Sequence, residues 1–165
     1  MIEKKVELDD LSDLLRSVYD YWRARGGDDL RCSWRGFHLE ELPAAVLPTT
    51  LVVDVKEDPA ANVYRFWGSS LKFIHGADLT GRTTAELEPP EMAKIVHATH
   101  AATVRTGKPS CSLFGFTRHG GFDHHHTALR LPLSDDGTRV THIVVAIDLT
   151  ATGWADVDKQ RGEAL

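Results

Sequence analysis

The sequence predicts an α+β domain in which one helix, two strands, a cluster of short helices, one long helix and three further strands follow one another. Three observations predict this class. Apolar residues recur at helical spacing near the N-terminus, β-branched runs bounded by turn residues occur in two separate blocks, and glycines divide the segment after the first block into short pieces. With 165 residues, of which 42% are hydrophobic, the chain is long enough for one domain with its own core.

The first predicted element is an amphipathic helix from Asp9 to about Arg25. Its two leading aspartates suit a helix start, and Gly26-Gly27 is typical of a helix end. Large apolar residues recur every three or four positions along it and form one stripe. The stripe consists of Leu11, Leu14, Leu15, Val18 and Trp22.

A connector follows this helix. Residues 28–49 contain a glycine, two prolines and mixed polar and apolar residues, which indicates an extended segment lying across the core. We therefore expect residues 1–49 to pack on the core, residues 50–149 to form it, and residues 150–165 to be a short polar tail.

Five strands are predicted, and a long helix separates their two blocks. The helix begins after Pro89-Pro90 and is closed by Gly107. Turn residues join the strands within each block, over Asp58–Asn62, His119–Gly121 and Ser134–Gly137. The strands are Thr50–Asp58 and Val63–Trp67 in the first block, then Ser110–Arg118, Phe122–Pro132 and Arg139–Leu149 in the second.

The segment from Arg65 to Leu87 is broken into short helices. Its glycines, Gly68, Gly76 and Gly81, permit positive φ and abrupt turns, and Asp78 can cap a helix start. Several short helices can leave a gap over a sheet, whereas one straight helix packs densely. The sequence therefore predicts either a small cavity beneath these helices or a core that their own side chains fill.

Four short motifs follow the order of these elements. The helix contains YWRARGGDD, the connector ELPAAVLP, the second strand YRFWGSSL, and the broken segment GADLTGR. This combination resembles the PAS sensory fold, and one bacterial stand-alone single-domain PAS subfamily in particular, over residues 50–149 and the preceding helix and connector. It implies a PAS-like five-stranded antiparallel sheet with helices covering one face, preceded by the N-terminal amphipathic helix. A cone-shaped α+β fold of small isomerases is the alternative, but that fold does not place two strands before a cluster of small helices.

The resemblance implies a stand-alone sensory or regulatory module that binds a small ligand or a protein partner and signals by a conformational shift. It implies a homodimer formed through the apolar stripe of the N-terminal helix, unless that stripe packs on its own sheet. Because the tail is short and polar, a separate output protein is expected. We expect the ligand cavity to be lined by Phe66, Leu71, Phe73, Ile74, His100, Phe114, His125 and Leu129.

Nine histidines raise the alternatives of metal and haem binding. His124 and His126 share one face of their predicted strand, but no carboxylate follows them to complete a metal site. His125 shares the other face with Leu129, so we expect it to point inward. On the long helix, His100 is a better candidate than His97 for a haem ligand, and a haem-binding sensor stays an alternative function.

Composition excludes other classes. A net charge of -5 with scattered basic residues argues against nucleic-acid and anionic-membrane surfaces, and the absence of a long apolar run predicts a cytoplasmic protein. No catalytic motif occurs, so we do not expect an enzyme. A small α+β enzyme with its site in the cavity stays an alternative, because Asp54 and Asp148 lie within apolar strands; Arg65 and Arg130 could instead pair with them.

Overall fold

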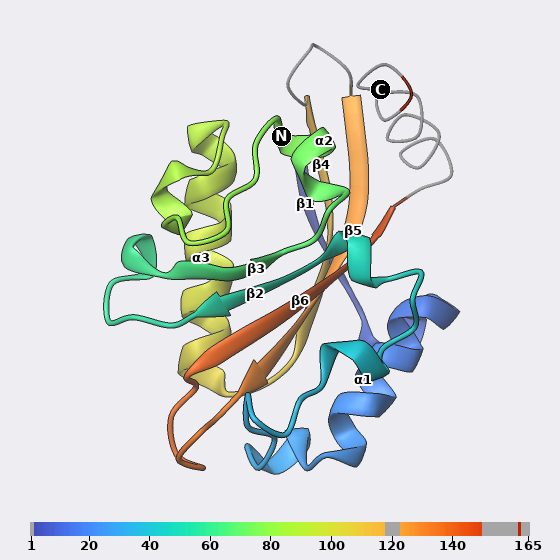
Figure 1. Ribbon diagram of the computed structural model, residues 1–165, viewed down its shortest axis with the longest axis vertical. Coiled ribbons are helices and arrows are strands. Elements are labelled where there is room, and N and C mark those ends of the chain that lie inside the picture. Colours follow the sequence, from blue (N-terminus) through green and yellow to red (C-terminus); the bar gives the residue numbers. More distant parts are fainter. Residues whose placement is uncertain (1, 118–122, 150–161, 163–165) are drawn as a thin grey trace.

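A six-stranded antiparallel sheet runs through the computed structural model, which describes residues 2–117, 123–149 and 162 (Figure 1). The strands lie side by side in the order β1-β4-β5-β6-β2-β3. Their bounds are β1 Ile2–Val6, β2 Thr50–Asp54, β3 Val63–Trp67, β4 Ser110–Thr117, β5 Asp123–Leu133 and β6 His142–Leu149.

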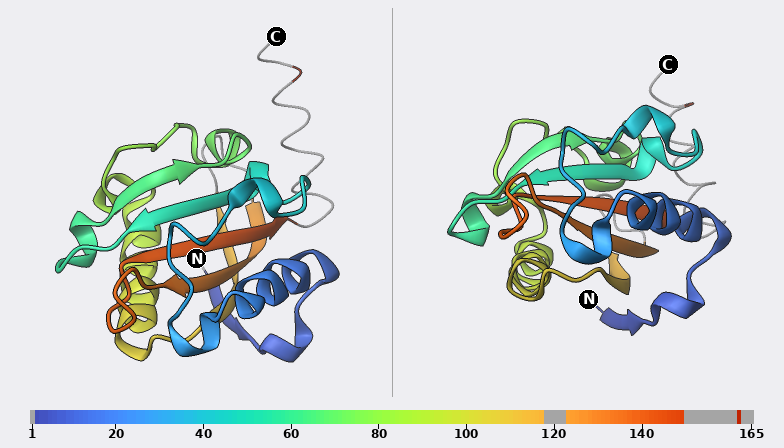
Figure 2. Two further views of the ribbon diagram at one scale, coloured as in Figure 1. Left: turned by 60° about the horizontal axis from the view of Figure 1, so that its bottom comes forward. Right: turned by 90° about the horizontal axis from the view of Figure 1, so that it is seen from below.

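Helices cover both faces of this sheet. The strands β2 and β3 cross in front of α3 in Figure 1, and the left view of Figure 2 shows α1 in front of the strands with α3 behind them. The helices are α1 (Asp13–Ala24), α2 (Leu71–His75) and α3 (Pro90–Thr106). Among the described residues, none of the helices combines the length and apolar character that a bilayer span requires.

The five predicted strands are confirmed, and β1 adds a sixth that the sequence did not predict. β1 pairs with β4, from Ile2 opposite Gly115 to Val6 opposite Cys111. Its short sequence, IEKKV, contains three charged residues, which favour an exposed edge over the interior of a sheet. Such a strand has no hydrophobic run to reveal it. The predicted turn at His119–Gly121 lies outside the described residues.

Two separate cores lie on the two faces of the sheet. Strand β5 contributes to both, because successive side chains of a strand point to opposite faces. Leu129, Leu131 and Leu133 pack toward α1, whereas Ala128 packs toward α3. Both sides of the central strands are therefore removed from water.

The apolar stripe of α1 packs on the chain's own sheet. Leu15, Val18 and Trp22 are fully buried, and the indole Nε1 of Trp22 donates to the carbonyl oxygen of Pro132 at 2.8 Å. The helix starts at Ser12, whose side chain accepts a hydrogen bond from the Leu15 amide. The stripe is thus not available to join two protomers, which corrects the expectation of a dimer through it.

Two glycines of the broken segment allow turns that no other residue would fit. Gly76 ends α2 with a φ of 76°, in the left-handed region. At Gly68, a Cβ would lie 2.4 Å from the carbonyl oxygen of Pro48, so only glycine lets the chain leave β3 against the connector. The expected positive φ is thus confirmed at Gly76 and at Gly81, whose φ is 78°, while Gly68 serves a close approach.

We predict that Leu15→Ala will lower the free energy of unfolding by about 2–5 kcal/mol, because a fully buried side chain leaves a cavity between α1 and the sheet. Urea denaturation followed by circular dichroism measures the loss. Leu14→Ala, at a half-buried position next to it, is the matched control and should cost less than half as much. Equal losses in the two variants would contradict the packing of α1 described above.

Candidate ligand cavity

A cavity of about 50 Å³ lies between the sheet and the helices α2 and α3. On the scale of about 10–15 Å³ for each water, it has room for roughly three to five water-sized groups. Its walls are mostly aromatic and aliphatic, with a few polar side chains. The lining residues are Leu51, Tyr64, Trp67, His75, Leu87, Met92, Val96, His100, Phe114, His126, Ala128, Arg130, Val145 and Ile147.

Among the described residues, two of the buried polar atoms that make no hydrogen bond belong to the lining residues Trp67 and His100. They are Nε1 of Trp67, on β3, and Nδ1 of His100, on α3. In folded proteins the great majority of buried polar atoms are partnered, and leaving one unpartnered costs about 1–3 kcal/mol. One of these atoms comes from the sheet and the other from helix α3, and both residues line the cavity.

His100 is held in its neutral form. Complete burial, followed by the nearby positive charge of Arg130, lowers the pKa of its imidazole to about 3. A neutral imidazole has one donor and one acceptor nitrogen. His100 can therefore give or take one hydrogen bond inside the cavity without carrying charge.

Arg130 is a buried cation at the end of the cavity. It is 2% exposed, its Nη1 donates to Ser112 Oγ at 2.9 Å, and its guanidinium lies 5.1 Å from the ring centre of Phe114. Burial lowers its pKa to about 10, so it stays charged at neutral pH. This places one fixed positive charge in a wall that is otherwise largely apolar.

Contacts between aromatic rings join several of the lining side chains to one another. Trp67 packs edge-on against both Tyr64 and His75, with ring centres 4.8 Å and 5.4 Å apart. Phe114 packs against His126 with ring centres 5.6 Å apart. The cavity is thus framed by rings from β3, α2, β4 and β5 whose positions depend on one another.

The structure brings two of the eight expected cavity residues to the cavity, His100 and Phe114. Leu71 and Ile74 are buried in the core on the same face, and Phe73 packs against that core, but none of the three lines the cavity. The other three expected residues do not lie on this face: Phe66 and Leu129 belong to the core under α1, and His125 is exposed.

The error at His125 and Leu129 has a physical cause. The alternation of leucines in β5 predicts that His125 and Leu129 share the cavity face, but these leucines pack under α1 on the opposite face. The even-numbered positions instead face the cavity, so His126 lines it in place of His125. When both faces of a strand are buried, apolar alternation cannot show which one has the cavity.

The prediction that Phe66 lines the cavity is wrong because β3 contains a β-bulge. Val52 pairs with Phe66 but Val53 pairs with Tyr64, so Arg65 is an extra residue in β3. Tyr64 and Trp67 consequently both point into the cavity, although they are three residues apart. Strict alternation from Trp67 would have placed Tyr64 on the other face, and no signal in the sequence marks the bulge.

The sequence matches no protein-family model and no curated protein. It does resemble solved structures. The VqmA dimer of Vibrio cholerae without target DNA, a LuxR-type receptor, aligns with a TM-score of 0.54 and 15% identity over 70% of this chain and 52% of that one. VqmA bound to DPO gives a TM-score of 0.50 and 16% identity over 61% of this chain and 52% of that one. The chain thus spans about half the length of VqmA.

A third similar structure is itself a PAS domain. The PAS domain of Bordetella pertussis BvgS aligns with a TM-score of 0.50 and 18% identity, over 70% of this chain and 88% of the BvgS domain. The chain has a PAS fold. Strands β3-β2-β6-β5-β4 form the five-stranded sheet that the sequence predicted, and β1 extends it at the β4 edge.

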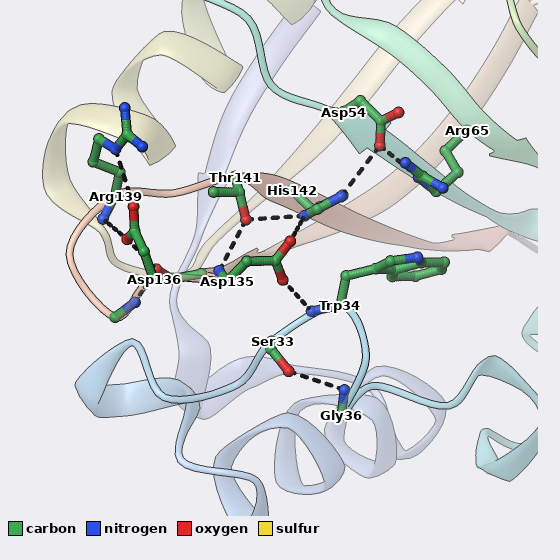
Figure 3. A network of polar contacts seen from close by, with 12 residues as sticks. Ser33, Trp34, Gly36, Asp54, Arg65, Asp135, Asp136, Arg139, Thr141 and His142 are labelled. Carbon is green, nitrogen blue, oxygen red and sulfur yellow. Dashed lines mark hydrogen bonds and ion pairs between the residues drawn. The ribbon is translucent and has the colours of Figure 1, made fainter.

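A polar cluster lies on the other face of the PAS sheet, where β2, β3 and β6 meet the connector (Figure 3). Arg65 Nε binds Asp54 Oδ1 at 2.6 Å, which confirms the expected partner of that carboxylate. His142 lies 3.4 Å from Asp54 and 3.7 Å from Asp135, and its ring stacks on Trp34. The cluster thereby ties the connector to the sheet.

Asp148, the other carboxylate within an apolar strand, has a different partner from the arginine expected. Asp148 accepts a hydrogen bond from Ser12 Oγ at 2.5 Å, at the start of α1, and does not pair with Arg130. Asp54 and Asp148 are therefore both used for structural contacts outside the cavity. Neither lines the cavity.

The cavity does not fit a haem. Its volume of about 50 Å³ is far below the roughly 300–1,000 Å³ of pockets that hold drug-sized ligands. The imidazole of His100 lines the cavity, so a small ligand could reach it. In the described part of the chain, no three histidine, cysteine or acidic side chains come together as a metal site. The side chain of His124 lies outside the described residues.

We predict that His100 makes the protein less stable as the pH falls from about 6.5 toward 3. Its folded pKa is lowered, so the unfolded state binds the proton first, and unfolding becomes easier by up to about 1.4 kcal/mol for each pH unit in that window. His142 is also buried, and burial lowers its pKa as well, so it acts in the same direction.

Urea unfolding of the wild type and His100→Leu at pH 7.5, 5.5 and 4.5 measures this effect. The difference between the two proteins should shift in favour of the variant as the pH falls, because leucine binds no proton. A difference that stays constant between pH 7.5 and 4.5 would contradict the burial of a neutral imidazole at this position.

Proposed function

We propose that this PAS domain is a non-catalytic sensory module whose cavity binds a small molecule. The observation that carries the proposal is the pair of unpartnered polar atoms, Trp67 Nε1 and His100 Nδ1, in an otherwise apolar cavity wall. A molecule that accepts a hydrogen bond from the indole and bonds the imidazole would satisfy both. Binding would then recover the free energy that their burial costs.

The similar structures support the proposal at the level of the fold. VqmA, whose fold this chain shares, is described in complex with DPO and in a complex with ligand and DNA. The chemical identity of a ligand for this chain must come from its own lining residues. Those residues favour a small, partly polar molecule.

Signalling would follow from a shift between conformations. Helix α2 is a single short turn between two glycine-containing bends, and its His75 packs on Trp67 in the cavity wall. A ligand that binds more tightly to one arrangement of α2 and α3 would increase the population of that arrangement. We further propose that a separate output protein, or a second copy of the chain, reads this change at a surface other than the buried stripe of α1.

Native mass spectrometry of freshly purified protein tests the proposal. The wild type should retain a small-molecule mass under native conditions that is lost on denaturation. His100→Phe should reduce the occupied fraction at least tenfold, because it fills part of the cavity and removes the Nδ1 partner.

His97→Phe is the matched control, since His97 lies on the same helix but does not line the cavity, and it should leave the occupied fraction unchanged. A wild type with no bound mass, or equal loss in both variants, would count against the proposal. An absorption spectrum of the same sample tests the haem alternative, which requires a Soret band.

A further inference from the structure

The cavity wall has one permanent positive charge and no carboxylate. Of its described lining residues, Arg130 is the only Arg or Lys, and none is Asp or Glu. This is notable in a chain whose net charge is -5, because acidic residues outnumber basic ones overall. We propose that the ligand is a small carboxylic acid whose carboxylate pairs with Arg130. The inference rests on the proposed function of the cavity and names the chemistry of its ligand.

Arg130 is an incompletely paired buried charge. Within the described residues, its guanidinium donates one hydrogen bond, to Ser112 Oγ, and no carboxylate lies within 4.0 Å of it. A guanidinium has five N–H donors in a planar fork, and burying a cation is costly unless it is paired and hydrogen-bonded. The face of the Phe114 ring offers only partial compensation.

The neighbouring groups do not neutralise this charge. Glu3 of β1 is an acidic neighbour whose Oε1 accepts from Ser112 Oγ at 3.1 Å; its negative charge raises the pKa of Arg130, but among the described residues the two form no ion pair within 4.0 Å. Glu3 is exposed and therefore screened by water. Burial raises the pKa of the Cys111 thiol to about 11, so the sulfur is uncharged at neutral pH.

The shape and polarity of the cavity favour a carboxylate over other anions. A planar carboxylate can accept two parallel hydrogen bonds from a guanidinium, and the apolar walls suit a short hydrocarbon group. Nε1 of Trp67 supplies a further donor. A volume of about 50 Å³ limits the ligand to a few non-hydrogen atoms, the size of acetate or propionate.

Isothermal titration calorimetry with sodium propionate and with propionamide tests the inference, after exhaustive dialysis of the full chain. The two probes have nearly the same shape, but only propionate carries a charge. We expect propionate to bind at least tenfold more tightly than propionamide. Arg130→Met should reduce propionate affinity at least tenfold, and Arg130→Lys should retain part of it because the charge remains.

Two further measurements separate ligand binding from a structural role of Arg130. Without ligand, Arg130→Met should have a melting temperature equal to or above that of the wild type, because methionine removes a buried charge that lacks a carboxylate partner. Arg65→Met is the control: Arg65 lies on β3 outside the cavity and its loss should change propionate affinity by less than twofold. Circular dichroism confirms that each variant is folded.

Three outcomes would overturn the inference. They are propionamide binding as tightly as propionate, propionate binding undiminished in Arg130→Met, and no heat from either probe. If propionamide bound as tightly as propionate, the cavity would still be a ligand site, but the inference that its ligand is a carboxylate would be wrong. Whether the cavity takes any small molecule is decided independently by the native mass spectra, so failure of the two proposals can be told apart.

Discussion

The structure depends on the burial of β5 on both of its faces. Its leucines pack under α1, while His126, Ala128 and Arg130 face α3 and the cavity. One strand therefore supports an apolar core on one side and presents polar side chains to a cavity on the other. The strict alternation of a β-strand keeps the two environments separate, because a side chain cannot change face without a bulge or a shift in register.

The two faces have different physical characters. On the α1 face, the core is closed, and the indole of Trp22 has its hydrogen-bond partner in Pro132. On the α3 face, within the part of the chain that the structure describes, Trp67 and His100 have polar atoms without hydrogen-bond partners, and Arg130 has no carboxylate partner. Both faces therefore have a hydrophobic core, and the groups that would gain from a bound molecule lie on the α3 face. This division is consistent with a domain that must stay folded while its ligand comes and goes.

The elements were predictable from sequence where the signal is local. The bounds of β3 were predicted as observed, and α3 begins and ends within a residue of its prediction, because prolines and Gly107 mark its ends. The cavity was predicted less well, because its lining depends on pairing between distant segments. The bulge at Arg65 and the burial of β5 on both faces decide which side chains meet there, and neither leaves a local pattern. His100 was found because the helical period alone places it on the buried side of α3.

The cavity also has a physical connection to the edge of the sheet. Arg130 donates to Ser112 on β4, and Ser112 donates to Glu3 on β1, so side-chain hydrogen bonds link the position of a ligand at Arg130 to the edge strand. The central claim, that the cavity takes a small molecule, is tested most directly by a high-resolution crystal structure of protein purified without denaturation. We predict electron density for a non-water molecule within hydrogen-bonding distance of Trp67 Nε1 and His100 Nδ1. A cavity collapsed by its own side chains, or occupied by water alone at both atoms, would contradict the account.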